Sequence, residues 1–308
     1  MNASAVVFGY HDVGVRCLKV LLSAGIDVPL VVTNVDDPHE TQWFGSVART
    51  AEDYGIPVIA PNDANSADVE RTLAGLRPDF IFSFYYRSLL DASLLRHAQR
   101  AALNMHGSLL PKFRGRAPVN WAILHGESET GATLHEMVAR ADAGDIVDQM
   151  AVPILRDDDA HAVFNKVTAA AEIVLHRSLP HLIDGTASRT PQNLRDGQYF
   201  GRRRAEDGRI DWRQGAVEIH NLVRAVAPPF PGAFTDINDN RLWIHKTLLE
   251  HERARTGGPA RLFGDQGRCY IACADGGVLR ILTAATVDGP VMMDALARAF
   301  EQRPFLLG

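Results

Sequence analysis

The first half of the chain alternates short apolar runs with segments in which apolar residues recur at helical spacing. Apolar runs typical of strands buried on both faces of a sheet occupy residues 5–8, 28–33, 57–59, 79–84 and 102–105. Segments with helical periodicity occupy residues 13–24, 46–54 and 69–76. Strands separated by helices imply right-handed crossovers between parallel neighbours. The pattern therefore predicts an α/β fold with a mostly parallel sheet.

The second half begins with a long helix and then changes character. A helix is expected over 160–184, and Gly185 is its stop signal. The following residues are polar and rich in turn formers, so a linker is predicted at 186–205. This linker would divide the chain into a first domain over 1–200 and a second domain over 206–308.

Short alternating segments fill the second domain. A short helix is expected over 216–226, and strands are expected over 241–245, 269–273 and 278–282. Residues that favour turns separate these strands. Short strands at this spacing predict a small antiparallel barrel.

Composition narrows the class of protein. The 308 residues suffice for one or two domains with a full core, and 46% hydrophobic against 22% charged residues is typical of soluble globular proteins. The net charge of -5 gives no support to nucleic-acid binding. The sequence shows no apolar run of transmembrane length and no recognisable signal peptide. We therefore expect a cytoplasmic protein without membrane insertion.

The cysteine and glycine patterns favour neither a metal nor a dinucleotide cofactor. Three cysteines, at positions 17, 269 and 273, lack the spacing of a zinc site and are expected to be reduced thiols. The turn over residues 9–14 follows the first strand but lacks the G-x-G-x-x-G spacing of a dinucleotide site. We therefore expect no metal and no NAD. This turn is interpreted as a tight strand-to-helix connection whose tip can still touch a substrate.

Candidate catalytic residues lie at the end of the apolar run 102–105. Asn104 and His106 are two residues apart on an extended segment, so their side chains point to the same side and can reach one reacting atom. Asp142 lies further along the chain, and a buried carboxylate there can hold the imidazole in its charged form. An amide donor and an imidazole suit acyl transfer between nitrogens, because both can stabilise a tetrahedral oxyanion while the ring moves protons.

Each of these residues also has a simpler interpretation. A single histidine near a strand end is more often packed or solvated than catalytic, and a single Asp before Ala-Gly is usually a turn residue. That interpretation weakens when the trio is taken together with the runs 104–111, 114–118 and 130–133 at their present spacing. We therefore predict that the three residues act together in catalysis.

These runs resemble the formyltransferase family that uses 10-formyltetrahydrofolate, which shares an Asn-x-His…Leu-Leu-Pro motif and a downstream Asp. The longer run 104–149, with 83–87 and 200–203, is similar to family members that formylate UDP-4-amino-4-deoxy-L-arabinose for lipid A modification. The similarity covers nearly the whole chain and weakens after about Ile244. It implies a formyltransferase with 10-formyltetrahydrofolate as cosubstrate. Together with the hydrophobic pattern, it implies a Rossmann-like, mostly parallel sheet followed by a smaller OB-like β-barrel domain.

The resemblance also implies contacts with the folate. One segment would supply backbone contacts to the pterin, a second would form the opposite wall, and Arg116 would contact the folate. The segments consist of Ser88, Leu89 and Leu90, and of Val138, Ala139, Arg140, Ala141 and Asp142. Residue types alone leave the loop with Lys112, Arg114 and Arg116 open, as a solvated loop or as a grip for anionic groups of a folate or nucleotide.

Three other functions stay open. Methionyl-tRNA formyltransferase is disfavoured, because that enzyme usually has a basic insertion where this chain has the acidic loop 34–40. It also usually reads Arg-Gly-Ala-Ala-Pro where this chain has the run 114–118. A formyltransferase for another nucleotide-linked aminosugar is the nearer alternative. The third is a noncatalytic folate-binding or nucleotide-sugar-binding protein, which the intact trio argues against.

The expected partners are therefore small molecules, namely a folate and a nucleotide sugar, without nucleic acid. The oligomeric state is left open. Some relatives continue into a dehydrogenase-decarboxylase domain with a nicotinamide cofactor, whereas this sequence ends at Gly308. Formyl transfer alone is expected from this chain.

Overall fold

The structure is a computed structural model that describes residues 3–38, 41–238, 240–250 and 256–308. The chain divides into two compact units. The first unit comprises residues 1–118, 129–153 and 164–201, and the second comprises residues 119–128, 154–163 and 202–308.

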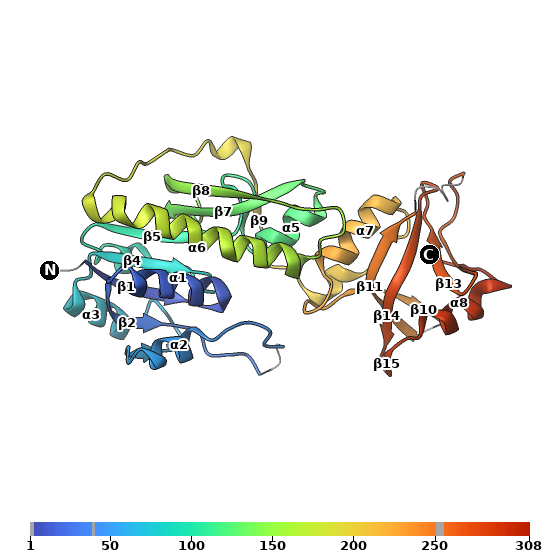
Figure 1. The fold of residues 1–308 in the computed structure, drawn as a ribbon, viewed down its shortest axis with the longest axis horizontal. Helices are drawn as coiled ribbons and strands as arrows, with labels where there is room; N and C mark the ends of the chain where they lie inside the picture. The colour runs from blue at the N-terminus through green and yellow to red at the C-terminus, as the bar shows by residue number, and fades with distance from the viewer. Residues whose placement is uncertain (1–2, 39–40, 239, 251–255) are drawn as a thin grey trace. The chain divides into compact units, whose positions relative to one another are not determined.

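A mostly parallel sheet forms the centre of the first unit (Figure 1). Its strands are β1 (Ser4–Gly9), β2 (Asp27–Val32), β3 (Val58–Ile59), β4 (Phe80–Phe84), β5 (Ala101–His106), β7 (Glu129–Glu136) and β8 (Ile146–Pro153). They follow the order β3-β2-β1-β4-β5-β7-β8, and the neighbours from β3 to β5 are parallel. The pairs β5–β7 and β7–β8 are antiparallel. The expected sheet is confirmed, and β7 and β8 are additions that the hydrophobic pattern did not predict.

Helices cover both faces of this sheet. They are α1 (His11–Ser23), α2 (Val47–Asp53), α3 (Ala67–Leu76), α4 (Ala92–Leu95) and α6 (Ala160–Asp184). Apolar side chains of α3 and α4 pack against β1, β2 and β4 in one buried cluster. The helices α1 and α6 lie together over the sheet (Figure 1), joined by an ion pair of 2.6 Å between Arg16 and Glu172. The helix predicted over 160–184 has these bounds in the structure, and Gly185 follows it with a positive φ of 73°.

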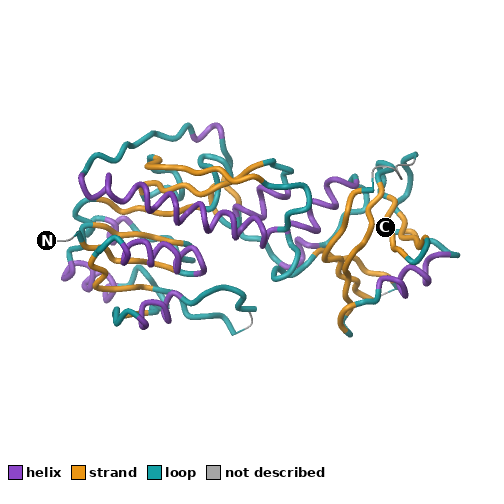
Figure 2. The backbone as a smooth tube through the Cα atoms, in the orientation of Figure 1, coloured by secondary structure: helices purple, strands orange, loops and turns teal. Residues whose placement is uncertain are grey.

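The segment after α6 is part of the first unit, rather than a free linker up to residue 205. Figure 2 shows it returning as a loop beside the outer strands before it reaches β9 (Tyr199–Phe200). Thr190 bridges Ile146, and β9 pairs with β6 (Arg114–Gly115), which places the boundary after residue 201. The polar composition suggested a linker. The segment instead forms hydrogen bonds with backbone atoms of the first unit. The 3-10 turn η1 (Leu194–Asp196) lies within it.

The second unit is built on a curled antiparallel sheet. Its strands are β10 (Ala233–Ile237), β11 (Asn240–Leu249), β12 (Arg261–Asp265), β13 (Arg268–Ala272), β14 (Val278–Thr286), β15 (Gly289–Pro290) and β16 (Phe305–Leu306). The order is β10-β11-β14-β13-β12-β16, with β15 beside β14. The other elements are α5 (Pro118–Leu124), η2 (Ala205–Gly208), α7 (Ala216–Ala225) and α8 (Met293–Glu301). This half-barrel agrees with the expected OB-like domain.

Two short segments belong to this second unit, although the sequence predicted them in the first domain. They are residues 119–128 and 154–163. The Asn120 amide donates to the backbone oxygen of Ala225 at 2.7 Å, and Arg224 donates to the backbone oxygen of Asp158 at 3.0 Å. Hydrogen bonds between residues distant in the sequence set this grouping, and the hydrophobic pattern does not reveal them.

The three cysteines are free and buried. Burial raises the pKa of the Cys269 and Cys273 thiols to about 12, so both thiols are protonated at neutral pH. In the described part of the chain, no helix combines the length and apolar character needed to cross a membrane.

Candidate active site

Strand β5 brings the first two predicted catalytic residues to the end of the parallel part of the sheet. Asn104 pairs with His135 across β5 and β7, and His106 pairs with Thr133. His106 is buried, with 6% of its surface exposed. Ligands bind beyond the carboxyl ends of parallel strands in open α/β sheets, and His106 is the last residue of β5.

Asp142 reaches the same place from the loop between β7 and β8. It has a φ of 51°, a left-handed conformation that Asp adopts more readily than most residues. The loop lies close against β7, since a Cβ on Gly144 would come within 2.0 Å of the backbone oxygen of Glu136. The Gln192 amide then donates to the backbone oxygens of Asp142 and Gly144, at 3.2 and 2.6 Å. These contacts hold the backbone of the loop, and so position the carboxylate of Asp142.

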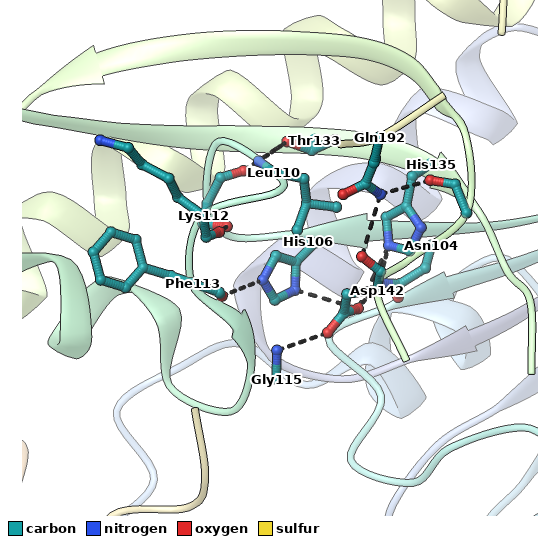
Figure 3. Close-up of polar contacts among 12 residues, drawn as sticks. Asn104, His106, Leu110, Lys112, Phe113, Gly115, Thr133, His135, Asp142 and Gln192 are labelled. Carbon is teal, nitrogen blue, oxygen red and sulfur yellow. Dashed lines mark hydrogen bonds and ion pairs between the residues drawn. The ribbon is translucent and has the colours of Figure 1, made fainter. Parts of the chain in front are cut away.

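The carboxylate of Asp142 lies at the centre of the cluster (Figure 3). Its Oδ1 lies 3.5 Å from the Asn104 Nδ2, 3.6 Å from the His106 Nδ1 and 3.5 Å from the His135 Nε2. Its Oδ2 accepts a hydrogen bond of 2.8 Å from the backbone N–H of Gly115. The three predicted catalytic residues are therefore brought together, and His135 joins them.

The surroundings of Asp142 favour the ionised carboxylate. The side chain is only 14% exposed, and this burial alone would raise its pKa. A positive charge on the His106 ring and the Gly115 N–H act in the opposite direction and hold the pKa well below its usual range. Asp142 is therefore negatively charged at neutral pH and can stabilise a positive charge on a neighbouring imidazole.

The loop after β5 fixes the other side of the His106 ring. The ring Nε2 donates to the backbone oxygen of Phe113 at 2.9 Å. The Thr133 hydroxyl donates to the backbone oxygen of Ser108 at 2.6 Å, and the Gln149 amide donates to that of Leu110 at 2.8 Å. The ring thus lies between a carbonyl oxygen and a carboxylate, in a loop that β7 and β8 hold in place.

The residues predicted to contact a folate lie on neighbouring segments of the first unit. The Arg116 guanidinium donates to the backbone oxygen of Arg87 at 2.7 Å, which joins its loop to the segment after β4. On that segment Ser88 and Leu89 are exposed and Leu90 packs against the core. The side chains of residues 138–140 are also exposed. Their roles stay predictions.

The loop with Lys112, Arg114 and Arg116 does not expose all three of these positively charged side chains. Lys112 and Arg116 are exposed, whereas Arg114 is 3% exposed and donates to the backbone oxygen of Gly197 at 3.3 Å. A Cβ on Gly197 would come within 1.8 Å of the backbone oxygen of Pro111, so the two segments lie in close contact. Arg114 is therefore placed to hold the loop rather than to bind an external anion.

Sequence reasoning missed His135, Gln192 and the buried hydroxyl of Tyr85, which has no hydrogen-bond partner and lies against Gly107. The only available signal was for His135, which lies two residues after Thr133 on an extended segment and so shares its face of the strand. Within the described residues, no group of His, Cys, Asp or Glu side chains is arranged to hold a metal ion.

This arrangement suits transfer of an acyl group. A fixed amide can donate to a developing oxyanion, and an imidazole beside a carboxylate can accept and return a proton.

Comparisons with known proteins agree with this chemistry. A model of the formyl transferase family matches residues 3–179, and a model of the formyl transferase C-terminal domain matches residues 203–299. The N-formyltransferase from Helicobacter canadensis, solved with folinic acid and dTDP-3-aminofucose, has a TM-score of 0.73 at 23% identity. The alignment covers 91% of this chain and 99% of that chain.

Two further solved structures share the fold. WlaRD, a sugar 3N-formyl transferase solved with dTDP and 5-N-formyl-THF, has a TM-score of 0.70 at 20% identity, over 94% of this chain and 98% of that chain. A 4-N formyltransferase from Francisella tularensis has a TM-score of 0.62 at 21% identity, over 77% of this chain and 93% of that chain. At these identities the likeness establishes the fold.

The lowered pKa of Asp142 predicts a pH-dependent contribution to stability. A carboxyl group with a depressed folded pKa stabilises the protein above its unfolded pKa of about 3.9, and this contribution is lost as the pH falls through the folded pKa. Asp142→Asn should therefore lower the free energy of unfolding by about 1–3 kcal/mol at pH 7. The deficit should shrink below about pH 4. Urea unfolding between pH 7 and 3 measures it, with exposed Asp184→Asn as control. A deficit that is constant across this range would contradict the assignment.

The close approach at Gly144 predicts a second effect. Gly144→Ala places a methyl group against the backbone of Glu136, so the loop must shift, at a cost of about 1–3 kcal/mol. Gly75→Ala is the matched control, because Gly75 lies in α3 with open space around it, and alanine is favoured there by up to about 1 kcal/mol. Thermal unfolding compares the two. Equal melting temperatures for both variants would show that the loop does not need glycine.

Proposed function

The chain belongs to the formyl transferase family of enzymes, and we propose that it transfers the formyl group of 10-formyltetrahydrofolate to the 4-amine of UDP-4-amino-4-deoxy-L-arabinose. The observation that carries the proposal is the convergence of Asn104 and His106 on the buried carboxylate of Asp142. Similar folds have been solved with folinic acid or 5-N-formyl-THF, which supports a formylated folate as the donor.

The reaction follows from the cluster. The neutral amine of the sugar attacks the formyl carbon, and negative charge develops on the formyl oxygen, where an N–H of Asn104 donates. His106 accepts the proton that the amine loses, while the Asp142 carboxylate stabilises the imidazolium. When the bond between the formyl carbon and the folate nitrogen breaks, His106 returns the proton to that nitrogen.

The folate is placed against the exposed segments around this cluster. We assign one wall to the backbone of Ser88, Leu89 and Leu90, the other wall to residues 138–142, and a contact to Arg116. These segments flank the cluster because Arg116 bonds to the backbone of Arg87, while the N–H of Gly115 bonds to Asp142. Ser88, Leu89, Arg116 and residues 138–140 are exposed and therefore accessible to a ligand.

Sequence resemblance supports the choice of acceptor. The runs 83–87, 104–149 and 200–203 resemble the formyltransferase half of the bifunctional polymyxin-resistance protein, whose product serves lipid A modification. We expect the reaction to take place in the cytoplasm. The second candidate is another nucleotide-linked aminosugar, and it is favoured by the dTDP-3-aminofucose in the Helicobacter canadensis structure.

A tRNA substrate fits the chain less well. The loop 34–40 carries acids where the tRNA enzymes usually carry a basic insertion, although His39 and Glu40 lie outside the described residues. Within this loop, Asp36 accepts a hydrogen bond of 2.7 Å from the Tyr10 hydroxyl. An acid held in this way opposes the approach of a phosphate backbone.

The mechanism predicts that three substitutions abolish most of the turnover. Asn104→Ala removes an oxyanion donor and should lower kcat by about 10² to 10³. His106→Ala and Asp142→Ala should lower it at least as strongly. Release of tetrahydrofolate by the purified, folded variants measures the effect. His176→Ala and Asp184→Ala, both exposed on α6, are matched controls. Near-native turnover in any of the three active-site variants would refute the assignment.

The acceptor is tested with one preparation of the full chain and 10-formyltetrahydrofolate. UDP-4-amino-4-deoxy-L-arabinose should yield the formamido sugar, and methionyl-tRNA should not be formylated. Formylation of a dTDP-linked aminosugar alone would move the substrate to the second candidate. Tight tRNA binding with a steep salt dependence would overturn the sugar assignment, because such a slope reports phosphate contacts.

A further inference from the structure

His135 is a buried histidine beside the catalytic cluster with no role in the mechanism above. It lies on β7 directly opposite Asn104, and its side chain is only 2% exposed. A buried imidazole needs partners for both ring nitrogens, so its contacts reveal how it can act.

The backbone fixes which nitrogen of the ring carries the hydrogen. The His135 Nδ1 lies 2.8 Å from the backbone oxygen of Glu136. A carbonyl oxygen only accepts, so Nδ1 is the donor, and in the neutral ring Nε2 is left with a lone pair. The partner nearest to this lone pair is the Asn104 Nδ2, at 3.0 Å.

This lone pair distinguishes the two ends of the Asn104 amide. The oxygen and nitrogen of a carboxamide have nearly the same shape, so packing alone cannot orient the group. Only the nitrogen end can face an acceptor. The reverse orientation would place the amide oxygen against the lone pair of His135.

The consequence concerns the second hydrogen of Nδ2. Its contact in the cluster is with the Asp142 Oδ1 at 3.5 Å, the limit for a hydrogen bond. The contact between His135 and the Asp142 Oδ1 is equally long, at 3.5 Å, so Asn104 is the nearer partner of the ring. One hydrogen of Asn104 is thus held by His135, and the other is weakly engaged.

We infer that His135 is a positioning residue, which orients the Asn104 amide so that its second N–H donates to the formyl oxygen in the transition state. This role rests on the proposed formyl transfer. His135 itself does not touch the substrate, and its effect passes through the hydrogen bond to Asn104.

The first test compares two substitutions of this histidine. His135→Leu fills a similar space but removes the acceptor, whereas His135→Gln retains a carbonyl oxygen that can accept from Asn104. His135→Leu should lower kcat about 10- to 100-fold, less than the loss of the donor itself. The KM for either substrate should change by less than about twofold, because only an interaction of the transition state is lost. His135→Gln should recover at least about half of the loss in log kcat. His176→Leu, at an exposed histidine, is the control.

A second measurement reports the orientation without turnover. Protein labelled with ¹⁵N-asparagine shows the side-chain amide of Asn104, and Asn104→Asp identifies that signal by removing it. In the unsubstituted protein and in His135→Gln, one amide proton should exchange slowly with deuterium. In His135→Leu it should exchange at least about tenfold faster, because its acceptor is gone.

The outcomes separate the two proposals. Native kcat and native amide exchange in His135→Leu would overturn the inference and leave formyl transfer standing. A loss of kcat that follows a fall in melting temperature, with no recovery in His135→Gln, would show a merely structural role and would also overturn it. If the unsubstituted protein formylates no aminosugar, the proposed function fails, while slow exchange of the Asn104 proton that depends on His135 would still support the orientation.

Discussion

The buried carboxylate of Asp142 is the constraint on which the site depends. A negative charge with little access to water is costly unless donors or positive groups surround it. Here these groups come from β5, which carries Asn104 and His106, and from the loop that carries Gly115. The strand supplies two contacts and the loop supplies one, so the strand, the loop and the carboxylate must be in place together. The unusual backbone conformation of Asp142 is maintained by the same surroundings.

Backbone contacts position this carboxylate, which explains why a polar segment far along the chain belongs to the site. Gln192 bonds to the backbone of Asp142 and Gly144, while β9 pairs with β6 next to Gly115. Glycine is needed where these segments touch, because a Cβ on Gly115 would come within 2.3 Å of the backbone oxygen of Phe200. The residues after α6 therefore support the loops of the candidate site rather than forming only a connection between domains.

The sequence predicts the parts of the fold whose signals are local. The strands β1, β2, β4 and β5 are continuous apolar runs because both of their faces are buried, and α6 has a clear period and a glycine stop. Strand β7 escaped prediction because polar residues such as Thr130, Thr133 and His135 lie on it and are buried. The motif drew attention to Asn104, His106 and Asp142, which the structure brings together. His135 was not predicted, because its partner Asn104 lies 31 residues away and the pairing register of β5 and β7 decides the contact.

The chemistry of the cluster and the identity of the acceptor place different demands on the chain. In the proposed reaction, Asn104, His106 and Asp142 act on the formyl oxygen and on a proton that any primary amine would lose, so their geometry is indifferent to the sugar that carries the amine. Selectivity must therefore come from residues that contact groups remote from the reacting atoms, since only such contacts differ between acceptors. A family can in this way keep one catalytic cluster while its members accept different nucleotide sugars. For the same reason, resemblance in the motif identifies the reaction more securely than the substrate.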